Sequence, residues 1–109
     1  MNAETSPGER RREATLHRFF NPASAAIVGA TEDLTKFGGR CLAQMMEFGY
    51  AGRIYPVNPK YDTMRGLRCY HSVRDLPEAP DHVGIVVAAE RVLDTLKQCA
   101  ELGVPFATV

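Results

Sequence analysis

The fold of this chain is decided by the stretch Ala25-Ala26-Ile27-Val28-Gly29 and by the loop over residues 30–37 that follows it. A short, continuous apolar run that ends at glycine is typical of a parallel β-strand buried on both faces. Beyond the loop, apolar residues recur at helical spacing over residues 38–49, and Gly49 is expected to end that helix. The sequence therefore predicts a strand–loop–helix unit.

The same alternation of strands and helices continues to the end of the chain. The further elements expected are strands at residues 53–57 and 83–87, an edge strand at 66–70, a helical turn from Ser72 through Leu76, a helix at 90–102 ended by Gly103, and a last strand at 106–109. The apolar side chains expected on one side of the long helix are Val92, Leu93, Leu96, Cys99, Ala100 and Leu102.

Strands that alternate with helices of about a dozen residues predict βαβ units and a mostly parallel sheet covered on both faces. We expect a Rossmann-like, doubly wound α/β fold in three layers. It should be incomplete at its C-terminus, because the last strand lacks a following helix. The 109 residues suffice for one domain, with a disordered or frayed polar leader at residues 1–17 and the domain at residues 18–109.

Composition excludes several classes of partner. The 13 basic and 13 acidic residues balance, so the whole-chain charge gives no argument for nucleic acid. No apolar run approaches the ~20 residues that cross a membrane, and the N-terminus has no apolar signal core. Three widely spaced cysteines suit a reducing compartment. We expect a cytoplasmic protein whose anion site, where one exists, is local.

Catalytic and metal-binding residues are not expected. The sequence has no C-x-x-C motif or Cys/His pair that would predict a metal site. His17, His71 and His82 are isolated, and no neighbouring acid or nucleophile makes any of them a catalytic base. We interpret each as a residue of the surface or of a strand edge.

The loop after the first strand is the first candidate binding site. A strand that leads into a helix presents free backbone N–H groups and the positive end of the helix dipole to an anion. Small residues would let a phosphate approach the backbone, with hydroxyls from Thr31 and Thr35 and a charge from Lys36. The loop is neither the dinucleotide motif G-x-G-x-x-G nor a P-loop. Glycines that serve only the turn and the packing are the alternative. The candidate residues here are Gly29, Ala30, Thr31, Lys36, Phe37 and Gly38.

The end of the second strand carries Asn58, Pro59 and Lys60. An NAD-binding fold normally places an acidic residue there, which bonds the ribose hydroxyls. An ammonium group would instead attract a ribose-linked phosphate, as in NADP or coenzyme A, although Lys60 is equally compatible with a solvated turn. At the third strand end, Val87, Ala88 and Ala89 offer small residues for an adenine or pantetheine arm, or simply for close packing.

Several motifs in order carry a resemblance to a known family. Residues 21–31, 36–40 and 52–60, with residues 66–70 and 80–83, resemble the N-terminal CoA-binding domain of the NDP-forming acyl-CoA synthetases, relatives of the succinyl-CoA synthetase α subunit. The resemblance covers nearly everything after Arg18. It implies that the loop from Gly29 to Gly38 receives the CoA phosphates, that Lys60 contacts the nucleotide end, and that residues 87–89 border the coenzyme. Family members often have a proline where Ala88 stands.

The resemblance also implies a place in a larger enzyme. Members of the family activate a carboxylate with ATP through an acyl phosphate and a phosphohistidine, and then form the CoA thioester. The phosphohistidine belongs to a later domain, so this chain would bind CoA without a catalytic residue. ATP, ADP and Mg²⁺ would belong to the full-length enzyme only, and the expected partners are the remaining synthetase domains or a further subunit, with a homo-oligomer left open. The alternatives are an NADP-binding oxidoreductase domain, a stand-alone CoA-binding regulatory module, and the CoA-binding part of a protein acetyltransferase with the same domain array.

Overall fold

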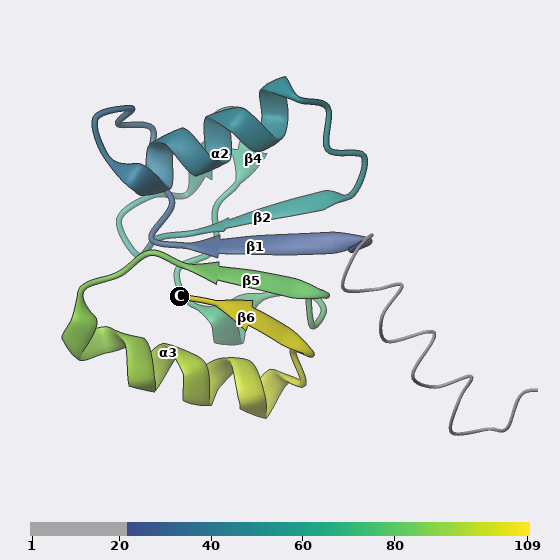
Figure 1. Ribbon diagram of the computed structural model, residues 1–109, viewed down its shortest axis with the longest axis vertical. Helices are drawn as coiled ribbons and strands as arrows, with labels where there is room; N and C mark the ends of the chain where they lie inside the picture. The colour runs from purple at the N-terminus through teal and green to yellow at the C-terminus, as the bar shows by residue number, and fades with distance from the viewer. Residues whose placement is uncertain (1–21) are drawn as a thin grey trace, which may run out of the picture.

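In the computed structural model, which describes residues 22–109, strand β1 (Ser24–Val28) is buried along its whole length. It pairs in parallel with β2 (Arg53–Val57) on one side and with β5 (His82–Ile85) on the other. Strand β6 (Phe106–Thr108) adds to the far side of β5, also in parallel. The sheet order is therefore β2-β1-β5-β6 (Figure 1).

Helices cover both faces of this sheet. Helix α2 (Phe37–Glu47) lies on one face, and α3 (Ala89–Leu102) lies on the other together with the short 3₁₀ turn η1 (Val73–Asp75) (Figure 1). Because side chains alternate along a strand, Ile27 packs in the cluster that contains Leu42 of α2, while Val28 packs in the cluster that contains Cys99 of α3. This confirms the predicted three-layer, Rossmann-like α/β fold.

The order of the strands creates a switch point beside β1. From β1 the chain crosses to β2, and it later returns to form β5 on the opposite side of β1. In open α/β sheets, ligands bind outside the carboxyl ends of the strands at such a point, where the loops diverge. The fold therefore places its natural binding crevice between the ends of β1 and β5.

The predicted edge strand at residues 66–70 is wrong. Its first part belongs to a separate antiparallel hairpin of β3 (Thr63–Met64) and β4 (Leu67–Arg68). Arg65 and Gly66 both have positive φ, 49° and 82°, which is the backbone of a two-residue type I′ turn. Only Tyr70 reaches the main sheet, as a single parallel bridge to Val57.

Helix α3 follows the prediction at its ends and departs from it on its sides. Gly103 ends the helix in the left-handed conformation, with φ 89°, and its N–H donates to the Cys99 and Ala100 carbonyls. Leu93 is 64% exposed and Ala100 is also exposed, so their predicted burial is wrong. At roughly 100° per residue they lie outside the narrow seam of Val92, Leu96 and Cys99 that packs on the core.

Some expectations lie beyond what the structure describes. The leader at residues 1–17, with His17, falls outside residues 22–109. Within residues 22–109, no helix has the length and the apolar character that crossing a bilayer requires.

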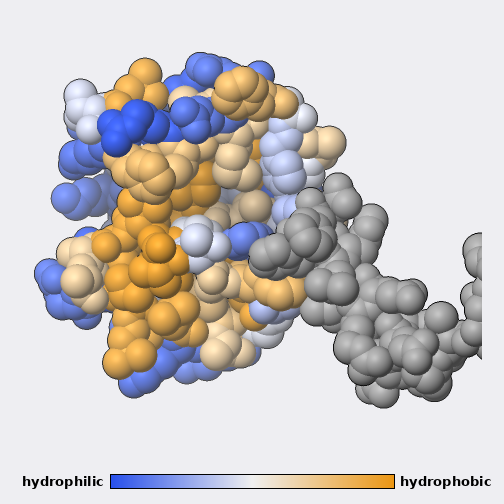
Figure 2. Space-filling model, in the orientation of Figure 1, coloured by the Kyte–Doolittle hydropathy of each residue, from blue (hydrophilic) through white to orange (hydrophobic). Residues whose placement is uncertain are grey.

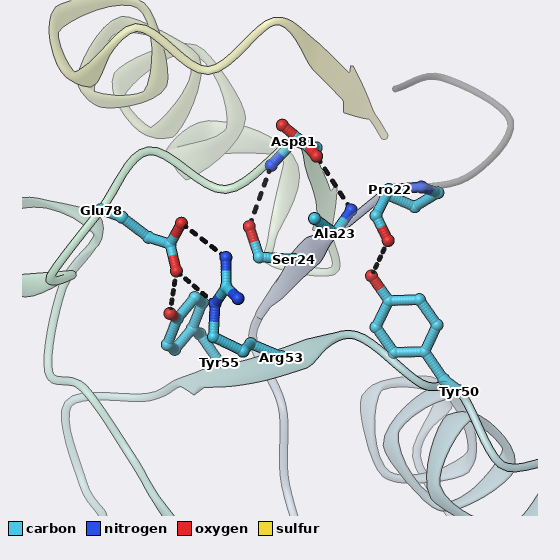
Figure 3. A network of polar contacts seen from close by, with 8 residues as sticks. All are labelled: Pro22, Ala23, Ser24, Tyr50, Arg53, Tyr55, Glu78 and Asp81. Atoms are coloured by element: carbon cyan, nitrogen blue, oxygen red, sulfur yellow. Dashed lines mark hydrogen bonds and ion pairs between the residues drawn. The ribbon is translucent and has the colours of Figure 1, made fainter. Parts of the chain in front are cut away.

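A polar network ties the amino ends of the strands together (Figure 3). Arg53 donates to Glu78 through two nitrogens, at 2.6 and 3.1 Å, and the Tyr55 hydroxyl donates to the same carboxylate. Nearby, the Asp81 carboxylate accepts a hydrogen bond from the Ala23 N–H at 2.9 Å. The Arg53 guanidinium, with the Tyr55 hydroxyl, holds the pKa of Glu78 below its ordinary value of 4.5.

We predict that Glu78→Gln lowers the melting temperature at pH 7, because the two-point contact to Arg53 is lost. Since the folded-state pKa of Glu78 is depressed, its contribution is present above the ordinary pKa and is lost as the pH falls through the folded value. The difference between the variant and the wild type should therefore shrink below pH 4.5. Thermal melts from pH 7 to pH 3 test this, and a difference that persists at the acid end contradicts it. Glu101→Gln is the matched control: it removes a single 3.5 Å contact to Arg74 and should cost less.

Candidate functional site

A cavity of about 660 Å³ opens at the carboxyl ends of the strands on the α3 side of the sheet. Its volume is in the range of small-molecule sites, which run from about 300 to 1,000 Å³. It is lined by Val28, Gly29, Thr31 and Lys36, by residues 57–61, 71–73 and 86–88, and by Arg91, Asp94, Thr95 and Gln98 of α3.

The structure brings most of the predicted site residues together in this one cavity. The predicted residues that line it are Gly29, Thr31, Lys36, Asn58, Pro59, Lys60, Val87 and Ala88. Four others do not line it. Ala30 and Gly38 are buried, Ala89 is the first residue of α3, and Phe37, 60% exposed, lines a different hollow on the α2 side.

The ends of β1 and β5 and the start of α2 meet at backbone contact. Gly29 has φ 91°, and a Cβ there would stand 1.9 Å from the Val86 carbonyl oxygen. A Cβ on Gly38 would stand 2.2 Å from the Gly29 carbonyl oxygen. Packing alone therefore explains both glycines, as the alternative interpretation held. The same close approach leaves the backbone uncovered where a phosphate would come in.

The loop between β1 and α2 is organised by Asp33. The Thr35 hydroxyl and N–H both donate to Asp33 Oδ1, at 2.6 and 2.9 Å, and they hold the pKa of Asp33 below its ordinary value. The Lys36 N–H donates to the Asp33 carbonyl, and Arg40 donates to the Leu34 and Thr35 carbonyls. The Thr35 hydroxyl is thus already engaged, and the Thr31 hydroxyl, which accepts a hydrogen bond from the Asp33 N–H at 3.2 Å, belongs to a residue that lines the cavity. The loop is held in shape by its own bonds.

The N-terminus of α2 is left open to an anion. Lys36 is its N-cap residue in an extended conformation, and among the described residues no side chain caps the helix and its first turn holds no acidic residue. The first N–H groups of a helix have no partner within the helix, and they carry the positive end of its dipole. An anion at this point would be favoured by the dipole and by the Lys36 ammonium group.

Asn58 places Lys60 rather than competing with it for a ligand. The Asn58 side-chain amide donates to the Ala30 carbonyl at 2.9 Å, and its Oδ1 accepts a hydrogen bond from the Lys60 N–H at 2.9 Å. Both ends of the amide are occupied, so the end of β2 is tied to the loop after β1. The Lys60 side chain is exposed, and within residues 22–109 it has no ion-pair partner.

Sequence reasoning missed the walls made by other segments. His71 lines the cavity, and its Nε2 lies 2.8 Å from Asp62 Oδ1, an acidic partner that the sequence did not indicate. The pair joins two segments nine residues apart whose approach depends on the β3–β4 hairpin. The α3 wall had a signal: Arg91, Asp94, Thr95 and Gln98 are polar residues at helical spacing on one side of the helix.

A second hollow, of about 1,120 Å³, lies on the α2 side of the sheet. Its lining includes Ile27, Phe37, Met45 and Ile85, and Figure 2 shows apolar side chains gathered between the two helices. Phosphates need donors and positive charge, which this surface lacks along most of its extent. Within residues 22–109, no three His, Cys, Asp or Glu side chains come together as a metal site requires.

Comparison with known proteins places these features in a family. Residues 23–109 match the model of the family described as "CoA binding domain". The chain is 37% identical over 97 residues to trans-feruloyl-CoA synthase FCS1 of an unknown prokaryotic organism. This alignment covers 88% of the chain and 14% of that protein. It is 37% identical over 99 residues to the acetate–CoA ligase [ADP-forming] I subunit alpha of Pyrococcus furiosus. This alignment covers 87% of the chain and 21% of that protein.

A solved structure agrees with this. The dinucleotide-forming acetyl-coenzyme A synthetase 1 of Ca. Korarchaeum cryptofilum superposes with a TM-score of 0.81 at 40% identity, covering 84% of this chain and 20% of that one. The chain thus spans about a fifth of the solved relative and 14–21% of the two curated relatives.

We predict that Gly29→Ala destabilises the protein by about 3 kcal/mol or more, because a left-handed backbone and a backbone clash act together. Gly66→Ala is the matched control. Gly66 has φ 82° but nothing within 4 Å of the position that a Cβ would take, so it should lose only the conformational term, about 1–2 kcal/mol. Urea unfolding of both variants measures the difference, and equal losses would contradict the importance of the Val86 contact.

Proposed function

The chain belongs to the CoA binding domain family, and on that premise we propose that the cavity at the carboxyl ends of its strands binds the nucleotide end of coenzyme A. In this proposal the pyrophosphate lies at Gly29 and the start of α2, beside Lys36, and the ribose-linked phosphate meets Lys60. The main support for this proposal is that the open N-terminus of α2 and two cations from separate loops line one cavity.

The charge balance of the cavity supports an anionic ligand. Its lining includes Lys36, Lys60 and Arg91, and within residues 22–109 none of the three has an ion-pair partner. The carboxylate in the lining is Asp94, which accepts a hydrogen bond from Gln98 at 2.9 Å. Because the whole chain is neutral, this surplus of positive charge is local.

We further propose that the domain serves an NDP-forming acyl-CoA synthetase. The named relatives differ in their acyl group, feruloyl in one and acetate in another, and share CoA. A domain common to both fits the recognition of CoA, with the acyl group selected elsewhere. When bound, CoA supplies the thiol that forms the thioester. ATP, ADP and Mg²⁺ would be held by the remaining synthetase domains or by a partner subunit. The proposal places the enzyme in the cytoplasm and includes self-association of the assembly.

We predict that the protein binds CoA more tightly than NADPH. Lys60 would serve a ribose-linked phosphate in either ligand, but the loop after β1 lacks the glycine spacing of a dinucleotide site. Isothermal titration calorimetry with the two ligands makes the comparison. A preference for NADPH would overturn the proposal and favour an oxidoreductase domain.

We predict that Lys60→Ala weakens CoA binding roughly 5- to 150-fold, the range of one charge-assisted contact. Dephospho-CoA, which lacks the ribose 3′-phosphate, should bind the wild type weakly and lose little more in the variant. Only a direct phosphate contact makes the two changes non-additive. Lys97→Ala is the control, because Lys97 is exposed on α3 and does not line the cavity.

Two results would contradict the role of Lys60. Equal losses for CoA and dephospho-CoA would place Lys60 at another part of the ligand. Unchanged affinity for both would identify Lys60 as a solvated turn residue.

A further inference from the structure

The wall of the cavity formed by α3 begins with Arg91. Four side chains of this helix line the cavity at spacings of three, one and three residues, so one side of its first two turns faces the site. The adjacent seam of Val92, Leu96 and Cys99 packs on the core. Helix α3 is therefore anchored by its apolar seam and presents a polar stripe to the ligand.

Arg91 is held in place by its backbone and is free at its guanidinium. Its carbonyl accepts a hydrogen bond from the buried Thr95 hydroxyl at 2.9 Å, and its N–H donates to the Ala88 carbonyl. Within the described chain the guanidinium has no ion-pair partner. Asp94, the lining carboxylate one turn further on, is instead bonded by the Gln98 amide at 2.9 Å.

The helix dipole disfavours a cation at the position of Arg91, whereas it suits the carboxylate of Glu90 in the same turn. Arg91 stands in the first turn of α3, where the helix dipole is positive. No side chain of the described residues caps this turn. A bound phosphate would interact favourably with both the helix terminus and the guanidinium. Local rules broken in this way are most often found at functional positions.

The polar stripe of α3 and Lys60 line the same cavity. Val73 and Leu76 pack in the same core cluster as Val92 and Leu96, so α3 lies against the segment that contains residues 71–73. Residues 71–73 line the cavity together with Lys60 and Arg91. The pyrophosphate position, in contrast, already has the open N-terminus of α2 and Lys36.

We propose that Arg91 is a second cation for the ribose-linked phosphate of the ligand and acts with Lys60 to select a ligand that carries this phosphate. The inference rests on the proposed function and adds a specificity-determining residue to it. A guanidinium can hold two phosphate oxygens at once, which a single ammonium group cannot do with the same geometry. Two cations from separate segments of one cavity would make the third phosphate the point that fixes the nucleotide.

The test measures the affinity of CoA and dephospho-CoA for the wild type, Arg91→Ala, Arg91→Lys and the control Lys97→Ala. We expect Arg91→Ala to weaken CoA binding about tenfold or more and to leave dephospho-CoA within about twofold. The affinity of Arg91→Lys for CoA should lie between that of the wild type and that of Arg91→Ala. In the double variant with Lys60→Ala, the losses for CoA should be non-additive.

The melting temperature of ligand-free Arg91→Ala distinguishes a structural role from a role in binding, because only a structural role would lower it. Arg91 is exposed and disfavoured by the helix dipole, so Arg91→Ala should leave the melting temperature unchanged or raise it. A lower melting temperature together with equal losses for every ligand would identify a structural role and overturn the inference.

The remaining outcomes separate this inference from the function on which it rests. Equal losses for CoA and dephospho-CoA, or no loss for either, overturn the role of Arg91 while CoA binding by the wild type leaves the proposed function standing. A wild type that fails to bind CoA overturns both.

Discussion

The contact between Gly29 and the Val86 carbonyl constrains everything around it. A Cβ at Gly29 would lie 1.9 Å from that oxygen, and a Cβ at Gly38 would lie 2.2 Å from the Gly29 carbonyl oxygen. The ends of β1 and β5 and the start of α2 can therefore meet only through glycine. This meeting fixes the crevice at the switch point of the sheet, and it leaves the N-terminus of α2 facing that crevice. Fold and binding site share one backbone contact.

Much of the fold was predictable because its signals are local. The limits of β2 agree with the prediction at both ends, and Gly103 ends α3 as expected, since a parallel strand and a helix stop each have short-range signatures. Residues 66–70 were misread because Leu67 and Arg68 pair with the segment just before them, and only Tyr70 of this stretch pairs with the sheet. The burial of Leu93 and Ala100 failed for a related reason: the width of the buried seam of α3 depends on what packs against the helix.

The candidate site likewise has features that could be predicted from the sequence and features that could not. Glycines, small residues and Lys60 at strand ends could be predicted, because parallel strands bring their carboxyl ends to one edge. The pairing of His71 with Asp62 could not, because it depends on segments brought together by the folded chain. The polar residues of α3 had a spacing signal, but only the folded chain shows that they line the cavity. Asn58 lines the cavity, and its side chain also has a structural task. Its amide is hydrogen-bonded to the backbone of Ala30 and of Lys60, so it ties the end of β2 to the loop after β1.

The distribution of ion pairs shows how a neutral chain builds a positive cavity. Away from the cavity, within residues 22–109, Glu78 is paired with Arg53 and Glu101 with Arg74, so these carboxylates neutralise cations of the outer surface. In the same part of the chain, three cations that line a single hollow are left without such partners: Lys36, Lys60 and Arg91. Like charges that share one hollow disfavour one another and would interact favourably with an anion that carries several charges. A ligand with separate phosphates fits that description better than a single carboxylate or one phosphate would. The arrangement of charge is therefore consistent with the proposed ligand, whose phosphates are separate.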